Sequence, residues 1–290
     1  MNTVYLNGQF RPRAEATISV EDRGFIFGDG VYEVWRVVNG RLFEADRHLA
    51  RLARGLRELR IDSTPATKGD GVQAIAERLL AENGLTEGEA TLYMEVTRGA
   101  APRTHHFPPA GTPPTVFAMT NRFVPPDDER ARGVSAVIVQ DVRWLRCDIK
   151  TVQLLPNVLA KQAAQEKGAM EAIFVRDGIV MEGSHSNLFG VIGGELRTHP
   201  TTNLILPGIT RAVVLELARA LGIPSREEAF TFAELPHVDE LFLAGTTTDV
   251  TPVVRVDDLT IGSGKPGPIS LRLLKELRTH IDASCAAVSA

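Results

Sequence analysis

The chain contains few residues that would cross-link it or attract a polyanion. Only two cysteines, Cys147 and Cys285, occur among 290 residues, and they lie far apart, which excludes a disulfide framework and a CxxC metal site. The formal net charge is −4, from 32 basic and 36 acidic residues, so no broad basic field favours nucleic acid or an anionic membrane as a partner. We therefore expect small-molecule partners and no metal site.

Long hydrophobic runs are also missing. No run approaches the ~18 apolar residues of a membrane span, and the first residues, MNTVYLNGQFRPR, lack the apolar core of a signal peptide. With 43% hydrophobic residues the chain can still bury a core of ordinary size, and its length favours two modest domains. These features predict a cytoplasmic protein without membrane contacts.

Strands and helices alternate along the chain without a regular βαβ order. The stretches TVYLNGQF and GVYEVWRVVNGRLFE are typical of strands, and the Asn39–Gly40 pair in the second stretch predicts a hairpin. Helices are expected over 48–60, 72–83, 156–167 and 210–221, and a glycine follows each of the last three. This order favours an α+β fold over a doubly wound parallel sheet.

The segment NRFVPPDDERARG separates two groups of β-rich stretches by paired prolines and a run of charges. We place the domain boundary there. The prediction is a smaller N-terminal domain over residues 1–120, a linker over 121–127 and a C-terminal domain over 128–290. The second domain then contains the β-rich stretches VSAVIVQDV, EAIFVRDGIV and SNLFGVI.

Lysine is scarce, and one lysine stands out. Of the six lysines, five lie in expected loops or on polar helix faces. Lys150 instead lies within an expected strand, RWLRCDIKTVQLL, on the same face as Val152 and Leu154. Loss of hydration there would leave its amine free to attack a carbonyl cofactor or substrate. The alternative is an edge-strand lysine whose amine reaches solvent, and periodicity does not decide between the two.

Three short motifs are compatible with the same chemistry. LPGITRAVV places Gly208, Ile209 and Thr210 at an expected helix start, where backbone amides and the helix dipole can hold a phosphate. EGSHSNLFG sets Glu182 between two β-rich runs, where a carboxylate can meet a ring nitrogen, and AGTTTDVTP offers the donors of Thr246. Each motif alone is also typical of a helix cap, a turn or a threonine-rich strand.

Together these motifs resemble the fold type IV family of pyridoxal-phosphate enzymes, and within it the D-specific aminotransferases. Seven blocks carry the resemblance over nearly the whole chain, in the family's order: EDRGFIFGDGVYEV, HLARL, VTRGAAPRTHHFP, RWLRCDIK, EGSHSN, LPGITR and GTTTDVTP. The resemblance implies a two-domain α+β fold, with a smaller N-terminal α/β sandwich and a C-terminal cofactor-binding domain that has a β-barrel-like core.

The resemblance also implies which residues bind pyridoxal 5′-phosphate. Lys150 would join the cofactor as a Schiff base and would then move the proton of the reaction, while Glu182 would keep the pyridine nitrogen protonated. Five further residues would hold the phosphate or pack against the ring: Arg51, Leu206, Ile209, Thr210 and Thr246.

On the substrate side, the D-specific enzymes bind the α-carboxylate with a tyrosine, an arginine and a histidine, the last two from the neighbouring subunit. The matching positions are Tyr32, Arg103 and His105, with His106 as an alternative to His105. The implied reaction is ping-pong transfer of an amino group from a D-amino acid, such as D-alanine or D-glutamate, to 2-oxoglutarate or pyruvate. The implied assembly is a homodimer with active sites at the subunit interface.

Some positions depart from this pattern or fit a rival. Gly245 stands where close relatives carry serine, and His185 interrupts a serine run. Arg36, in VYEVWR, is similar to a block of the branched-chain L-amino-acid aminotransferases, so branched-chain or mixed (R)-amine specificity is the main alternative. An aminodeoxychorismate lyase and a non-catalytic cofactor-binding scaffold are the remaining alternatives.

Overall fold

A six-stranded antiparallel sheet forms the centre of the first part of the chain in the computed structural model, which describes residues 2–286. In the order β2-β1-β6-β5-β3-β4, its strands are β1 (Thr3–Leu6), β2 (Gln9–Pro12), β3 (Gly30–Val38), β4 (Arg41–Leu42), β5 (Glu89–Thr97) and β6 (Thr115–Arg122). The expected hairpin is confirmed. It joins β3 to β4 through Asn39 and Gly40, whose φ angles of 48° and 77° lie in the left-handed region that this turn requires.

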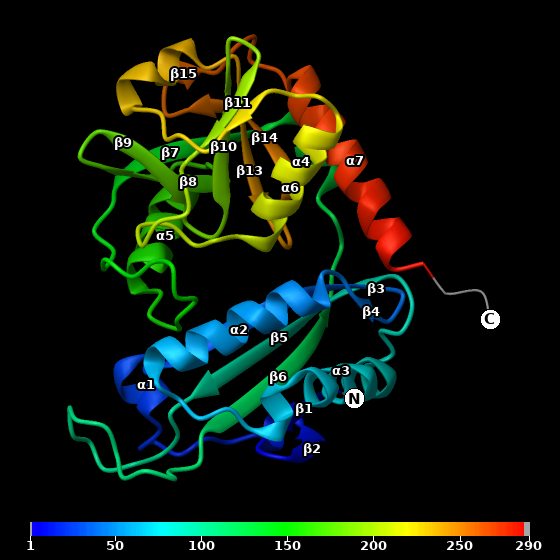
Figure 1. Cartoon of the computed structure of the whole chain (residues 1–290), viewed down its shortest axis with the longest axis vertical. Coiled ribbons are helices and arrows are strands. Elements are labelled where there is room, and N and C mark those ends of the chain that lie inside the picture. Colours follow the sequence, from blue (N-terminus) through cyan, green and yellow to red (C-terminus); the bar gives the residue numbers. More distant parts are fainter. Residues whose placement is uncertain (1, 287–290) are drawn as a thin grey trace. The chain divides into compact units, whose positions relative to one another are not determined.

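Two long helices cover one face of this sheet (Figure 1). The helical segments of this part are α1 (Arg23–Phe27), α2 (Ala45–Leu59) and α3 (Gly69–Asn83), with the 3-10 turns η1 (Arg13–Glu15) and η2 (Pro65–Thr67). The helices expected over 48–60 and 72–83 are confirmed as α2 and α3. Both begin earlier than predicted because their first turns contain small and polar residues, which carry no apolar periodicity.

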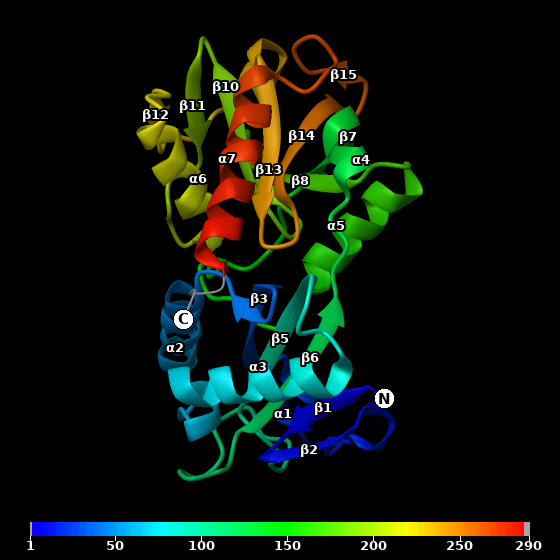
Figure 2. The ribbon, with the colours of Figure 1, turned by 90° about the vertical axis from the view of Figure 1, so that its right-hand side faces the viewer.

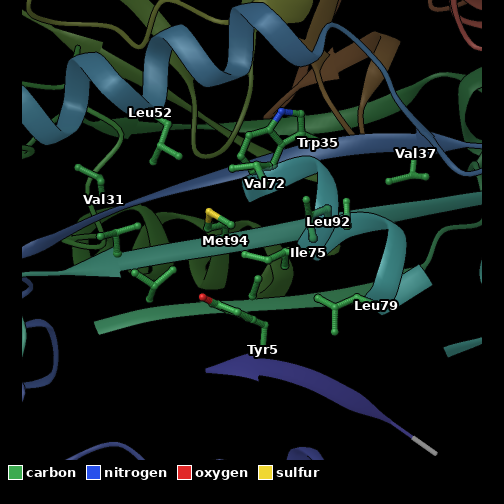
Figure 3. Close-up of a cluster of buried hydrophobic side chains, with 14 of the residues drawn as sticks. Tyr5, Val31, Trp35, Val37, Leu52, Val72, Ile75, Leu79, Leu92 and Met94 are labelled. Carbon is green, nitrogen blue, oxygen red and sulfur yellow. The ribbon is translucent and has the colours of Figure 1, made fainter. Parts of the chain in front are cut away.

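The sheet and the two long helices enclose a hydrophobic core (Figure 3). Trp35 of β3, Leu92 and Met94 of β5 and Leu52 of α2 are each at most 2% exposed, and truncating such a side chain to alanine costs about 2–5 kcal/mol. Because side chains alternate along a strand, Tyr32 lies on the face of β3 opposite to Trp35. This second face carries part of the candidate site.

A nine-stranded sheet forms the second part of the chain. Its order is β12-β11-β10-β13-β14-β7-β8-β9, with β15 paired to β14, and its parallel pairs are β7 with β14, β7 with β8 and β11 with β12. The strands are β7 (Val134–Gln140), β8 (Glu171–Arg176), β9 (Ile179–Gly183), β10 (Asn187–Ile192), β11 (Glu195–Thr198), β12 (Ser225–Arg226), β13 (Glu240–Gly245), β14 (Asp249–Val256) and β15 (Leu259–Thr260). Because β9, at one end of this order, contacts β10, the sheet curls into a half-barrel. The expected α+β fold with a barrel-like second sheet is confirmed.

Helices pack on the curled sheet (Figure 2). They are α4 (Asp127–Arg132), α5 (Leu155–Glu166), α6 (Ile209–Ala220) and α7 (Pro268–Ser284), with the 3-10 segment η3 (Phe232–His237). α5 contacts β7 and β8, and α6 contacts β13. The helices expected over 156–167 and 210–221 are confirmed as α5 and α6, whereas α7 was not predicted.

The strand predicted around Lys150 is wrong. The segment forms one isolated bridge, between Thr151 and Val31, instead of a ladder. The Tyr32 amide donates a hydrogen bond to the Lys150 carbonyl at 3.0 Å, but the Thr151 amide turns back to the Ile149 carbonyl at 2.9 Å. This tight local bond breaks the extended conformation that a strand needs.

The chain divides into two compact units that follow the two sheets. The first unit contains the described residues up to Val124, Ile149–Gln153 and the described residues from Asp282 onward, and the second contains Pro125–Asp148 and Leu154–Ile281. The domains expected over 1–120 and 128–290, with a linker over 121–127, stay a prediction. The compact units differ from them because backbone hydrogen bonds attach Ile149–Gln153 to the start of β3.

Candidate active site

Lys150, in the first unit, rests on an aromatic ring. Its Nζ lies 4.2 Å from the centroid of the Tyr32 ring, and the Tyr32 and Tyr93 rings stack at 5.6 Å. The lysine is half-buried, and within residues 2–286 no carboxylate forms an ion pair with it. A ring face attracts a cation but cannot accept its proton. The amine is therefore positioned without being occupied by a counter-ion, as a nucleophile requires.

Arg51, on α2, is held by a carboxylate that the sequence motifs did not indicate. Its Nε and Nη2 donate to Glu33 Oε2 and Oε1 at 2.9 and 2.7 Å, and His48 Nδ1 lies 3.0 Å from Glu33 Oε1. Burial by itself raises the pKa of Glu33, but the Arg51 charge and the His48 hydrogen bond hold that pKa well below its ordinary value. Glu33 is therefore a fixed anion that orients the arginine expected to clamp a phosphate.

Arg103 and His105 are both exposed and lie on the loop after β5. The Arg103 guanidinium carbon lies 5.3 Å from the centroid of the Phe27 ring, and the His105 ring lies 5.7 Å from the same ring. His106 Nδ1 instead lies 2.9 Å from the Phe107 carbonyl oxygen. Arg103 and His105 therefore contact the same ring, that of Phe27, whereas His106 turns to the backbone.

Arg36, the residue that favoured the branched-chain alternative, is paired inside its own unit. It is 3% exposed, forms an ion pair with Glu89 of β5, and stacks over the Phe123 ring with its guanidinium carbon 4.1 Å from the centroid. Its positive charge is already matched by a carboxylate. A substrate carboxylate would therefore have to compete with Glu89 for Arg36.

Glu182, in the second unit, is buried in a network around an arginine that the sequence motifs also did not indicate. Arg143 Nη1 donates to Glu182 Oε1 at 2.5 Å, while its Nε and Nη2 donate to the two oxygens of Asp141 at 2.9 and 3.0 Å. Burial, with a smaller contribution from the charge of Asp141, raises the pKa of Glu182 to about 7 against the opposing effect of Arg143. Asp141 also forms an ion pair with Arg176, whose Nη2 lies 3.1 Å from Asp141 Oδ2. Arg143 therefore gives Glu182 a single hydrogen bond within a cluster of two arginines and two carboxylates.

Backbone and amide groups fix the Glu182 carboxylate. The Leu206 amide donates to Glu182 Oε2 at 3.1 Å, and Asn187 Nδ2 donates to the same oxygen at 3.0 Å and to the Leu206 carbonyl at 2.9 Å. A Cβ at Gly208 would lie 2.0 Å from Asn187 Oδ1, so a larger residue there would displace the Asn187 amide. The predicted Leu206 is thus attached to Glu182 through its backbone, a role that its side-chain type did not indicate.

The predicted phosphate ligands of this unit lie at the ends of regular elements. α6 begins at Ile209, its N-cap residue Gly208 supplies no side-chain cap, and Thr210 is buried in the first turn. Thr246 lies in the turn after β13, where the Thr248 amide donates to the Gly245 carbonyl at 3.2 Å. A helix start without a capping side chain leaves amide donors for an anion. Their role as phosphate ligands stays a prediction.

His185, one of the departures from the family pattern, binds a buried carboxylate. Its Nδ1 lies 2.9 Å from Glu171 Oε2, and Ser184 and Ser186 also donate to Glu171. Burial by itself raises the pKa of Glu171, but the His185 hydrogen bond and charge, together with Ser184, lower it to about 2. His185 is therefore satisfied within this cluster.

The residues of these networks that were not predicted include Glu33, His48, Asp141, Arg143, Glu171, Arg176 and Asn187. Glu33, His48, Arg143 and Asn187 lie within the family blocks, which was the available signal. Single-sequence periodicity could not reveal them, because a charged residue at a strand position is ordinarily assigned to the solvated face.

Neither a membrane-spanning helix nor a metal-binding cluster occurs in the described residues. Among residues 2–286, no helix has both the length and the apolar character needed to cross a bilayer. No group of three or more His, Cys, Asp or Glu side chains in the described chain is arranged to hold a metal ion.

Comparisons with known proteins identify a family, a related sequence and similar folds. Residues 30–256 match the amino-transferase class IV family. The chain is 45% identical over 278 residues, 96% of each protein, to D-alanine aminotransferase of Bacillus licheniformis. Its fold is similar to the branched-chain amino acid aminotransferase of Escherichia coli, with a TM-score of 0.89 at 24% identity over 100% of this chain and 97% of the other. It is also similar to the T.th. branched-chain amino acid aminotransferase solved with pyridoxamine 5′-phosphate, with a TM-score of 0.86 at 26% identity over 97% and 94% of the two chains.

Proposed function

The chain belongs to the amino-transferase class IV family, and from this premise we propose that it transfers the amino group of a D-amino acid to a 2-oxo acid with pyridoxal 5′-phosphate as cofactor. The observation that carries the choice of substrate is the 45% identity to a D-alanine aminotransferase over 96% of both proteins. D-Alanine and D-glutamate are the expected donors, and pyruvate and 2-oxoglutarate the expected acceptors.

The donor groups of the two units fit this cofactor. An amine without a carboxylate partner, Lys150, suits covalent attachment of an aldehyde, and a buried carboxylate with a raised pKa, Glu182, suits a cationic ring nitrogen. Arg51, the α6 start at Ile209 and Thr210, and Thr246 would hold the phosphate, and Leu206 would pack against the ring. When bound, the cofactor supplies the carbonyl that accepts the amine and the ring that withdraws electrons from the substrate α-carbon.

Different residues of this chain have different roles in the proposed reaction. The Lys150 amine would take the proton from the substrate α-carbon, because it is the positioned base without a carboxylate counter-ion. Glu182, held by Arg143 and Asn187, keeps the ring nitrogen protonated and so stabilises the charge that develops when the α-proton leaves. The same groups act in reverse when the second substrate arrives, which gives ping-pong kinetics.

Tyr32, Arg103 and His105 are proposed to bind the substrate α-carboxylate. Arginine suits a bidentate carboxylate contact, and a fixed carboxylate position selects the face of the substrate that exchanges the proton, hence the D-enantiomer. Arg103 and His105 are exposed and grouped on Phe27. Their exposure supports the proposal that they complete the site of a second copy, in a homodimer with active sites at the subunit interface.

We also propose a cytoplasmic location, because the two cysteines, Cys147 and Cys285, are both free thiols and the cytoplasm keeps thiols reduced. The measurement is fractionation of the source cells followed by an activity assay. Recovery of the activity in the soluble cytoplasmic fraction is the expected result, and its recovery from an exported fraction would contradict the proposal.

The function is tested by offering D-alanine, L-leucine and (R)-1-phenylethylamine separately, with 2-oxoglutarate or pyruvate as the acceptor. Turnover of D-alanine with a preference over the other donors is expected. Turnover of L-leucine alone would favour branched-chain specificity, and turnover of the amine would favour mixed specificity. A visible absorbance band that borohydride bleaches distinguishes an enzyme with a lysine-bound cofactor from a protein that does not bind it.

A further inference from the structure

The loop between β5 and β6, residues 98–114, carries the two proposed carboxylate ligands beyond the end of the first sheet (Figure 1). Its two ends are joined through one buried carboxylate. The hydroxyls of Thr97 and Thr115 donate to Asp22 Oδ2 at 3.0 and 2.6 Å. Asp22 also caps α1, because its Oδ1 accepts a hydrogen bond from the Gly24 amide at 2.8 Å. The base of the loop is therefore fixed to the start of α1.

Arg23, the first residue of α1, holds the middle of this loop. It is 3% exposed, and its Nη1 donates to the Thr104 carbonyl oxygen at 2.7 Å. Its Nε donates to Asp29 Oδ2 at 2.9 Å, so the guanidinium is fixed by a second partner. Because Thr104 lies between Arg103 and His105, the carbonyl contact fixes the backbone that positions both side chains.

The Phe27 ring connects Arg23 to the two loop side chains. The Arg23 guanidinium carbon lies 4.7 Å from the ring centroid, and Arg103 and His105 contact the same ring. The face of an aromatic ring attracts a cation without neutralising its charge. Within residues 2–286, neither Arg103 nor His105 forms an ion pair with a carboxylate. Both side chains are therefore oriented while they stay available to an anionic ligand.

A second set of contacts holds the loop after His105. The Phe107 ring lies under Arg98, whose guanidinium carbon is 3.8 Å from the centroid, and Arg60 lies 4.7 Å from the same centroid. The Arg98 Nε donates to Asp29 Oδ2 at 2.7 Å, so Asp29 binds both Arg98 and Arg23. The backbone around the proposed carboxylate ligands is thus held on both sides.

We propose that Arg23 is a positioning residue for substrate binding, which holds the loop backbone at Thr104 and so presents Arg103 and His105 to the α-carboxylate. This inference rests on the proposed function, which makes these two side chains carboxylate ligands. It goes beyond that function by assigning their orientation to a buried arginine of α1. A loop held in its binding conformation need not be ordered by the substrate, so substrate affinity should depend on Arg23.

The test removes the donors of Arg23 and keeps a long side chain, through Arg23→Met, with D-alanine as the donor and 2-oxoglutarate as the acceptor. Because both substrates carry the α-carboxylate, both KM values should rise about tenfold, as expected for loss of a charge-assisted hydrogen bond, while kcat changes by less than about twofold. Arg23→Lys keeps the charge and an ammonium donor, so it should restore part of the affinity.

A double-mutant cycle separates positioning from a general loss of structure. In a chain that already carries Arg103→Ala and His105→Ala, Arg23→Met should lower kcat/KM by less than about twofold, because the side chains through which it acts are gone. Phe107→Leu, at a partly exposed position, loosens the loop without changing Arg23 and should raise both KM values about threefold. Arg122→Met, at an exposed position of β6, is the matched control and should change neither KM.

Unchanged KM values in Arg23→Met, or an equal effect with and without the two loop side chains, would overturn the inference. A parent protein that turns over no donor would instead reject the proposed function. Hydrogen exchange would then still decide whether Arg23 holds the loop. The amides of residues 105–107 should exchange faster in Arg23→Met than in the parent, and equal exchange would overturn the inference.

Discussion

Two buried carboxylates, one in each compact unit, differ in how arginine binds them. Glu33 binds Arg51 through two hydrogen bonds and also binds His48, whereas Glu182 shares Arg143 with Asp141. Both side chains lack solvent, and burial alone would raise both pKa values. Arg51 gives Glu33 two hydrogen bonds, whereas Arg143 gives Glu182 one and the charge of Asp141 opposes its ionisation. The pKa of Glu33 therefore falls well below its ordinary value, and that of Glu182 rises to about 7.

The difference assigns separate tasks to the two carboxylates. Glu33 is an anion at every physiological pH, and it stabilises the unit while it orients Arg51. Glu182 has a pKa of about 7 and a single hydrogen bond from Arg143, so a cationic ring nitrogen beside it would stabilise its charged form. The same residue type is therefore an anchor in one unit and a partner for the cofactor in the other.

The largest expected effect comes from Lys150, the amine proposed to bind the cofactor and to transfer the proton. Lys150→Ala should lower the transamination rate by about 10³-fold or more, because it removes both the covalent attachment and the proton-transfer base. The measurement is a single-turnover assay with D-alanine, together with the absorbance of the lysine-bound cofactor. Lys68→Ala, at an exposed position before α3, is the control and should keep full activity. Turnover by Lys150→Ala at the parent rate would show that another group is the base.

The same substitution at Glu33 and Glu182 separates an anchor from a cofactor partner. Glu33→Gln breaks a buried ion pair and should lower the free energy of unfolding by about 3–5 kcal/mol. Glu182→Gln removes a buried carboxyl whose pKa is raised in the folded state, so at neutral pH the cofactor-free variant should be no less stable than the parent, while kcat falls by about 10²–10³-fold. Denaturant unfolding and steady-state kinetics of both variants check the pair. Equal losses of stability in Glu33→Gln and Glu182→Gln would contradict the different roles of the two carboxylates.

The sequence predicted the elements of this fold better than it predicted the networks. Helices α2, α3, α5 and α6 follow from apolar spacing and terminal glycines, because those signals are local. The segment around Lys150 was mistaken for a strand because its fold depends on a single bridge to β3 and on one tight backbone turn. Such contacts depend on tertiary structure and leave no periodic pattern.

The candidate site shows the same limit. Family motifs predicted Lys150, Arg51 and Glu182 as a lysine, an arginine and a carboxylate with separate roles. They did not indicate that Arg143 is shared with Asp141, because the sharing depends on three side chains converging across the second sheet. The different hydrogen bonds and charges around Glu33 and Glu182 could therefore be obtained only from the structure.

The pH dependence of stability sharpens the comparison further. A carboxyl group whose pKa is raised in the folded state binds a proton more tightly when folded. The cofactor-free protein should therefore lose stability as pH rises from about 4.5 to about 7, by up to about 3 kcal/mol relative to Glu182→Gln. Thermal unfolding of the parent and the variant over this range checks the difference. Glu33 contributes in the opposite sense, because its pKa is lowered, and its stabilisation is lost only below about pH 4.5.

Addition of the cofactor provides the control for this measurement. A protonated ring nitrogen beside Glu182 would stabilise the charged form of this carboxylate, so the loaded parent protein should lose less stability over the same pH range. An identical pH profile with and without cofactor would contradict the role of Glu182.

The smallest expected effect concerns Gly245, at the end of β13 in the second unit. A Cβ there would lie 3.2 Å from Thr248 Oγ1 and 3.7 Å from the His185 carbonyl oxygen, so a serine requires a shift of only a few tenths of an ångström. Gly245→Ser should add one hydrogen bond to the cofactor phosphate, about 1.5 kcal/mol for a charged acceptor, and lower the cofactor Kd about tenfold. Titration of the cofactor-free protein measures this Kd, with Gly245→Ala as the matched control for the added Cβ. If serine and alanine change the Kd equally, the hydroxyl does not reach the phosphate, and this edge of the second unit binds it through backbone amides alone.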